Sequence, residues 1–172
     1  YFFATISQLE RRVRLLRAEI PRDLPREYDV LSRNCGDLID RLLGELRLLR
    51  DGEKYQHPNV QRERTRALQR VISDMDILEA VGIAALTRRG IDDDYLNRMM
   101  GQIRREITYP LIVPVVTSLS QQYFGIYPEL NLLTVPLVEG RFLLHLPDLY
   151  HELGHPLLVV RDDPKIEPFQ ER

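Results

Sequence analysis

The sequence predicts an α+β protein: an N-terminal bundle of about four helices, then a β-hairpin or small sheet, then a helix with a His-Glu-x-x-His motif. Apolar residues recur three and four positions apart over the first hundred or so residues, which is the helical period. After Tyr109 the pattern changes to extended runs, and a His-Glu-x-x-His motif follows them. We expect a helical unit at 1–108 and a unit with the sheet and the motif helix at 109–172.

Each expected helix carries one apolar stripe and ends at a recognisable signal. Pro21 ends the first stripe because proline cannot continue a helix, and Gly52 follows the second. Gly90 ends the third, and the acidic run Asp92–Asp94 opens the fourth, where the helix dipole favours negative charge. The expected helices cover 2–20, 31–49, 60–88 and 92–107.

The segment after Tyr109 combines one expected short helix with two expected strands. Pro114 suits the first position of a short helix that Gly125 would close. Two extended runs then flank the turn Glu139-Gly140, which predicts a hairpin. Pro136 cannot donate to a ladder, so its strand should lie at a sheet edge or be bulged there. The expected ranges are 114–123 for the helix and 131–138 and 141–146 for the strands.

Charge and cysteine content exclude several classes of protein. The 24 basic and 26 acidic residues give a net charge of −2, which predicts neither a nucleic-acid partner nor a membrane partner. No apolar run approaches the roughly 20 residues of a spanning helix. The single cysteine, Cys35, cannot form an internal disulfide, so we expect a cytoplasmic protein. The amphipathic N-terminal helices could also dock a protein partner.

His151, Glu152 and His155 combine residue types and a spacing that suit metal-assisted hydrolysis. Residues four apart on a helix point to the same side one turn apart, so one ion can bridge both imidazoles, and neutral imidazoles suit Zn²⁺. Glu152 could then take a proton from a metal-activated water and pass it to the leaving amine. Asp148 would either cap the helix or orient a ligand imidazole through its second nitrogen.

This motif, preceded by a hairpin, resembles the active-site helix of the zincin metallopeptidases, and its Leu-Gly centre is typical of the gluzincin kind. The resemblance covers about 131–155 and implies that His151 and His155 are zinc ligands and Glu152 the general base and acid. It also implies a third ligand, a carboxylate from a later helix. Four carboxylates follow the motif in a stretch without helical pattern: Asp162, Asp163, Glu167 and Glu171. We therefore expect the third ligand beyond Arg172 or on a partner segment.

The sequence departs from related patterns at defined positions. Leu158 and Arg161 stand where the extended metzincin motif has Gly and a third His, and no counterpart exists of the Cys and Gln segments of peptide deformylases. Pro156 cannot donate to the carbonyl of Glu152, so the motif helix should end or kink there. Two further residues have ordinary explanations: His145 as a cross-strand polar residue and Cys35 as a packing thiol.

The sequence therefore predicts a zinc-dependent metallopeptidase that acts on a peptide or protein substrate. The alternative is a helical interaction or regulatory module in which the His-Glu-x-x-His helix is structural or vestigial.

Overall fold

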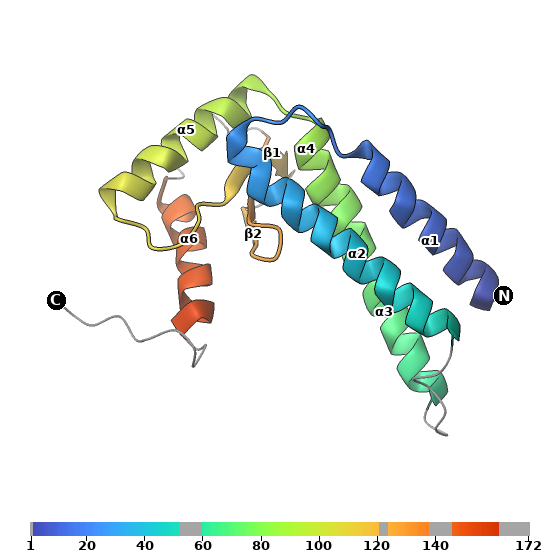
Figure 1. Ribbon diagram of the computed structural model, residues 1–172. Coiled ribbons are helices and arrows are strands. Elements are labelled where there is room, and N and C mark those ends of the chain that lie inside the picture. Colours follow the sequence, from blue (N-terminus) through green and yellow to red (C-terminus); the bar gives the residue numbers. More distant parts are fainter. Residues whose placement is uncertain (1, 52–59, 121–123, 138–145, 162–172) are drawn as a thin grey trace. The chain divides into compact units, whose positions relative to one another are not determined.

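The structure, a computed structural model, describes residues 2–51, 60–120, 124–137 and 146–161 (Figure 1). It confirms the α+β class, with helices and a small three-stranded sheet. The chain divides into two compact units, Tyr1–Arg88 and Arg89–Arg172. The division falls at residue 88 and not at the expected 108, because the fourth expected helix is bonded to a strand of the second unit.

The first unit is entirely helical over the residues that the structure describes. Its three expected helices are confirmed, and the third, expected at 60–88, runs continuously over 60–87 through a π-helical turn. Its elements are α1 (Phe2–Glu19), η1 (Arg26–Tyr28), α2 (Asp29–Asp51), α3 (Val60–Ile77), η2 (Leu78–Ile83) and α4 (Ala84–Thr87). No helix in the described part of either unit has both the length and the apolar character needed to cross a bilayer.

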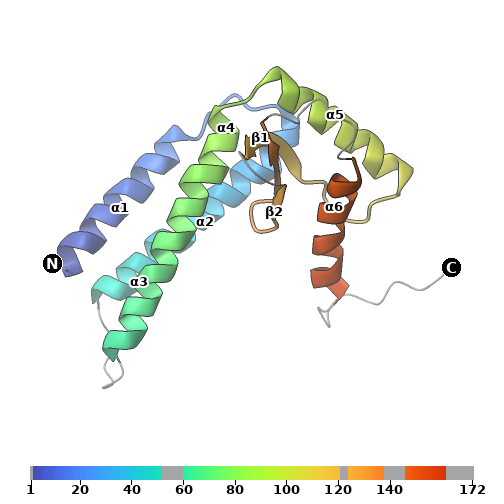
Figure 2. The same cartoon turned by 180° about the vertical axis from the view of Figure 1, so that it is seen from behind.

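The apolar stripes of the first unit face one another. α2 packs against α1 on one side and against α3 and η2 on another, and Figures 1 and 2 show α1 and α2 side by side. Burying each large aliphatic side chain stabilises the fold by about 1.5–3 kcal/mol. The fully buried side chains include Ile6, Val13, Leu16, Leu31, Cys35, Ile39, Leu42, Leu46 and Leu78.

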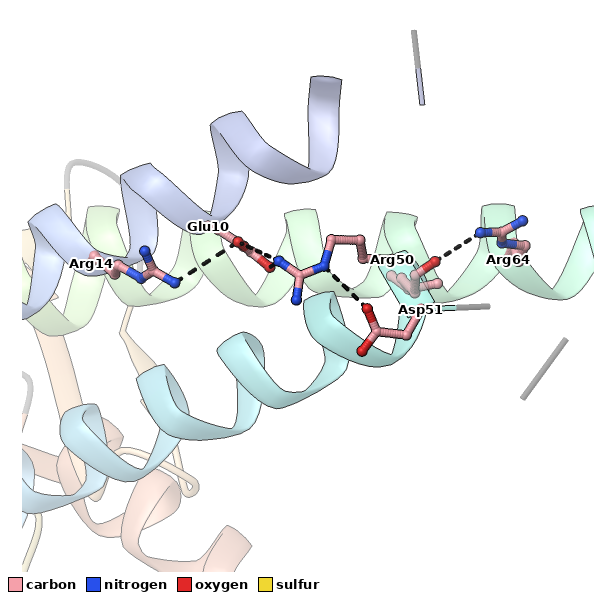
Figure 3. Close-up of polar contacts among 6 residues, drawn as sticks. Glu10, Arg14, Arg50, Asp51 and Arg64 are labelled. Atoms are coloured by element: carbon pink, nitrogen blue, oxygen red, sulfur yellow. Dashed lines mark hydrogen bonds and ion pairs between the residues drawn. The ribbon is translucent and has the colours of Figure 1, made fainter. Parts of the chain in front are cut away.

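Arginines hold a buried carboxylate between these helices. Glu10 of α1 is 7% exposed, and Arg50 of α2 approaches its carboxylate at 3.3 Å. Arg14 lies 3.9 Å from the same carboxylate, and Arg64 of α3 donates to the Leu49 carbonyl at 2.8 Å. Figure 3 shows these contacts running from α1 through α2 to α3. The buried charge is thus compensated, and the same region fixes three helices.

The second unit contains the sheet and the motif helix. Its elements are α5 (Ile91–Glu106), β1 (Val115–Ser120), β2 (Gly125–Tyr127), β3 (Leu132–Pro136) and α6 (Leu146–Arg161). The strand order is β1-β3-β2, with β1 parallel and β2 antiparallel to β3. The fourth expected helix is confirmed as α5.

The short helix expected at 114–123 is wrong, because Val115–Ser120 form strand β1. Val115, Val116 and Thr117 are β-branched and fully buried, and such side chains favour a pleated, packed surface over a helix. The Pro114 signal was compatible with either structure. Pairing with β3 decides the outcome, and local sequence does not contain that information.

The predicted hairpin is only partly within the described chain. Its first run contains β3, which pairs with β1 and β2, while 138–145 lie outside the described residues. Leu146, expected as the end of the second strand, is instead the first residue of α6. Pro136 lies on the central strand, so the edge alternative is wrong. The ladder is irregular at Pro136 as expected, but the extra residue lies on the partner strand, because the register shifts between Ser118 and Ser120 of β1.

Two side chains of α5 bind the backbone of β1. Asn97 accepts from the Val116 N–H at 2.9 Å and donates to the Val116 carbonyl at 2.8 Å. The buried Asp93 accepts from the Ser118 N–H at 2.7 Å and from the Gly90 N–H at 2.9 Å. The second carboxylate of the acidic run therefore caps its own helix and satisfies a strand.

Candidate metal centre

The motif lies on α6, whose apolar face packs into the core of the second unit. Leu149 and Leu153 are buried there together with residues of α5, β1 and β3. Leu146, Tyr150 and Leu157 are partly buried against the same core. Because apolar residues recur three and four apart, one face of the helix is buried and the opposite face carries the motif histidines.

The three motif residues lie together on the outer side of α6. His151 and His155 are exposed, and Glu152 is half-buried. The two imidazole rings meet edge to face, with centroids 4.8 Å apart and planes at 87°. One possible ligand atom from each of the three residues lies within 4.8 Å of the others.

This donor set fits zinc. Imidazole nitrogens are ligands that zinc prefers, at about 2.0–2.1 Å from the ion. Two ligands of a tetrahedral site are thus separated by roughly 3.3 Å. Both rings are exposed, so rotation about their side-chain torsions can bring their nitrogens to that separation. His151 and His155 would hold the ion, and Glu152 would lie beside it.

The structure describes Asp148 but not the candidates for the third ligand. Asp148 lies in the first turn of α6 and is exposed. Its position one turn before His151 is compatible with either of its expected roles. His145 and the four later carboxylates Asp162, Asp163, Glu167 and Glu171 lie outside the described residues.

Pro156 does not end the motif helix, since α6 continues from Leu146 to Arg161. Its ring nitrogen has no hydrogen and cannot bond the carbonyl of Glu152, the residue four positions earlier. The residue before a proline is also disfavoured in helical geometry, and here that residue is His155. The weakened turn therefore coincides with the metal motif.

Tyr109, which the sequence analysis treated only as a boundary, reaches this turn. Its hydroxyl donates to the Leu153 carbonyl at 3.0 Å in a buried hydrogen bond. The side chain is 6% exposed, and burial raises the pKa of its phenol because the phenolate would lose its hydration. The sequence signal was slight: a tyrosine directly after a helix, 44 positions from its partner.

A mostly apolar surface pocket of about 320 Å³ borders the same region. Tyr109 and Pro156 both line it, together with Ile126 of β2 and Pro114, which precedes β1. Pro156, the residue that follows the motif, therefore borders an apolar hollow.

The buried Cys35 belongs to a different unit from the motif. It lies in the core of the first unit, and desolvation raises the pKa of its thiol to about 12. Such a thiol is almost entirely protonated near neutral pH, which agrees with the packing role expected from the sequence.

Comparisons of the chain with protein-family models, with curated proteins and with solved structures found no match.

Proposed function

We propose that this protein is a zinc-dependent metallopeptidase whose reaction takes place at the exposed face of α6. The observation that supports this most directly is the grouping of His151, Glu152 and His155, with possible ligand atoms within 4.8 Å of one another. Exposed carboxylates often gather by chance, but two imidazoles and a carboxylate at this helical spacing are characteristic of a catalytic zinc helix.

His151 and His155 bind the metal as neutral imidazoles, each through one nitrogen. When bound, zinc supplies Lewis-acid chemistry that polarises a peptide carbonyl and acidifies a water molecule. Glu152 would be the general base and acid, whose carboxylate would take a proton from the attacking water and pass it to the amine of the leaving product. The remaining ligand would come from a segment other than those that the structure describes, on this chain or on a partner.

The test measures zinc content and peptide hydrolysis on the same preparations. The wild-type protein should retain one zinc after dialysis and cleave a mixture of unstructured peptides. Glu152→Gln should keep the zinc and lose cleavage by at least about 100-fold, the usual size of a general acid–base contribution. His151→Ala should lose both, while Glu106→Gln, a matched control on the exposed face of α5, should change neither.

Two results would end the proposal: a wild-type protein without stoichiometric zinc, or unchanged cleavage by Glu152→Gln. A protein that neither binds zinc nor cleaves peptides leaves the interaction module, in which the helices of the first unit dock a partner, as the remaining hypothesis. Cleavage of a different substrate class with the same dependence on Glu152 would keep the mechanism and replace the substrate.

A further inference from the structure

The separation of the two motif histidines depends on one turn of backbone. His151 and His155 lie one turn apart on α6, so a change in the twist or rise of that turn changes the distance between their nitrogens. Metal affinity is sensitive to such changes because zinc needs its ligands at defined distances. The contacts that fix the turn between His151 and His155 therefore affect the zinc site.

The helix's own hydrogen bonding is incomplete at this point. Pro156 lacks the N–H that would bond the Glu152 carbonyl, and its ring is in steric conflict with that carbonyl. The same proline disfavours helical geometry at His155. Two of the three motif residues therefore lie where α6 is weakest, although the helix continues to Arg161.

Tyr109 supplies a bond at the next carbonyl. Its hydroxyl donates to Leu153 at 3.0 Å, between Glu152 and His155 in the sequence. Its ring is buried in the cluster that contains Leu149 and Leu153, so the side chain has little freedom to move away.

Tyr109 is itself fixed at the end of α5. Its N–H bonds the Arg104 carbonyl at 3.0 Å, and the N–H of Ile107 bonds Ile103 at 3.0 Å. Thr108 between them has a φ of 51°, in the left-handed region that a threonine rarely adopts. The chain thus turns sharply after α5, and the tyrosine hydroxyl reaches the backbone of α6 at Leu153.

We propose that Tyr109 is a positioning residue for the metal centre: its hydroxyl holds the α6 backbone at Leu153, so that His151 and His155 keep a common face across the turn that Pro156 weakens. This inference rests on the proposed function, because it assumes that the histidines bind zinc. It assigns the hydroxyl of Tyr109 to the geometry of the site and not to the reaction.

The first experiment measures zinc affinity by competition with a chromophoric chelator. Tyr109→Phe keeps the buried ring and removes only the hydroxyl, and we expect it to bind zinc about 10-fold more weakly, the lower end of effects from residues that orient metal ligands. Tyr95→Phe, an exposed tyrosine of α5, is the matched control and should bind like the wild type. Amide hydrogen exchange of the metal-free proteins should show faster exchange in α6 for Tyr109→Phe alone.

The second experiment tests the link with the proline. Pro156→Ala restores the missing N–H donor, so α6 should depend less on the tyrosine. We expect the zinc-affinity loss caused by Tyr109→Phe to fall to about twofold in the Pro156→Ala background, which a double-mutant cycle measures directly.

The outcomes separate this inference from the proposed function. A hydrogen bond that only stabilises the fold would lower the urea midpoint of Tyr109→Phe without changing zinc affinity, and that result overturns the positioning role. An equal loss in both backgrounds overturns the link with Pro156. If the wild-type protein binds no zinc, the proposed function fails first, and the inference fails with it.

Discussion

Asn97 on α5 bonds both backbone polar groups of Val116 on β1, as acceptor at 2.9 Å and as donor at 2.8 Å. The amide side chain takes the place of a neighbouring strand at this position. Val116 is fully buried, so water cannot easily replace those two bonds.

Asn97→Ala should therefore destabilise the protein by about 1–3 kcal/mol, the cost of leaving buried backbone groups without partners. Urea unfolding followed by circular dichroism measures the change. Gln102→Ala, on the exposed face of the same helix, should shift the free energy of unfolding by less than about 0.5 kcal/mol. Equal shifts for the two variants would contradict this account of β1.

Arg50→Ala should destabilise the helical unit by about 1–2 kcal/mol. Its guanidinium contacts the carboxylate of Glu10, which is 7% exposed and would lose much of its compensation. Arg50 is itself partly exposed, so the effect stays below that of a fully buried pair. Thermal unfolding measures the change, with Arg47→Ala on the exposed face of α2 as the control.

Salt adds a second criterion to the Arg50 prediction. At about 1 M salt the Debye length is near 3 Å, so the part of the effect that comes from Coulomb attraction should shrink. A destabilisation that is identical at low and high salt would show that Arg50 acts through packing of its aliphatic stem and not through its charge.

Zinc should stabilise the protein, and removing zinc should reverse the effect. A ligand that binds only the native state adds about 2.7 kcal/mol to the free energy of unfolding at 100 times its dissociation constant. Thermal unfolding with zinc, with zinc plus a chelator, and with His155→Ala measures the contribution of the site. Magnesium at the same concentration is the control, because it prefers oxygen ligands. An equal response to magnesium would argue against an imidazole site.

Stability should fall at alkaline pH because of Cys35. Its thiol pKa rises from 9.0 to about 12 on folding, so between these values the unfolded state has lost a proton that the folded state keeps. The contribution is complete below pH 9 and is lost as the pH rises toward 12. At pH 10 the loss is about 1 kcal/mol. The stability of Cys35→Ala should vary less over this range.

The reactivity of the same thiol provides an independent measurement. Native protein at pH 8 should react slowly with a thiol reagent, because the thiolate is scarce and the side chain is buried. Reaction should become fast in urea. Fast labelling of the native protein would show that the core around α2 opens readily.

The helices could be predicted because their information is local. The stripes that contain Leu42 and Met100 follow the helical period, and proline or glycine marks the ends. The limits of α1, α2, α5 and the continuous helix of α3, η2 and α4 were therefore expected close to their actual positions. The motif histidines share a face for the same reason. Helical spacing alone is enough to bring His151 and His155 together.

The strands and the supporting contacts could not be predicted in the same way. β1 pairs in parallel with β3, although β2 comes between them in the sequence. Nothing within Val115–Ser120 specifies that partner. Tyr109 and Leu153 are likewise 44 positions apart. Such contacts depend on the tertiary fold, and a single sequence without its relatives contains little information about them.

The way α5 covers β1 also protects the protein from self-association. An edge strand usually exposes a row of unsatisfied amides and carbonyls on which another chain can polymerise. Here the side chains of Asp93 and Asn97 already bind the outward groups of Ser118 and Val116. A strand from another molecule would have to displace both side chains before it could extend the sheet beside β1. The contacts of α5 with this edge therefore oppose the growth of fibres by strand addition.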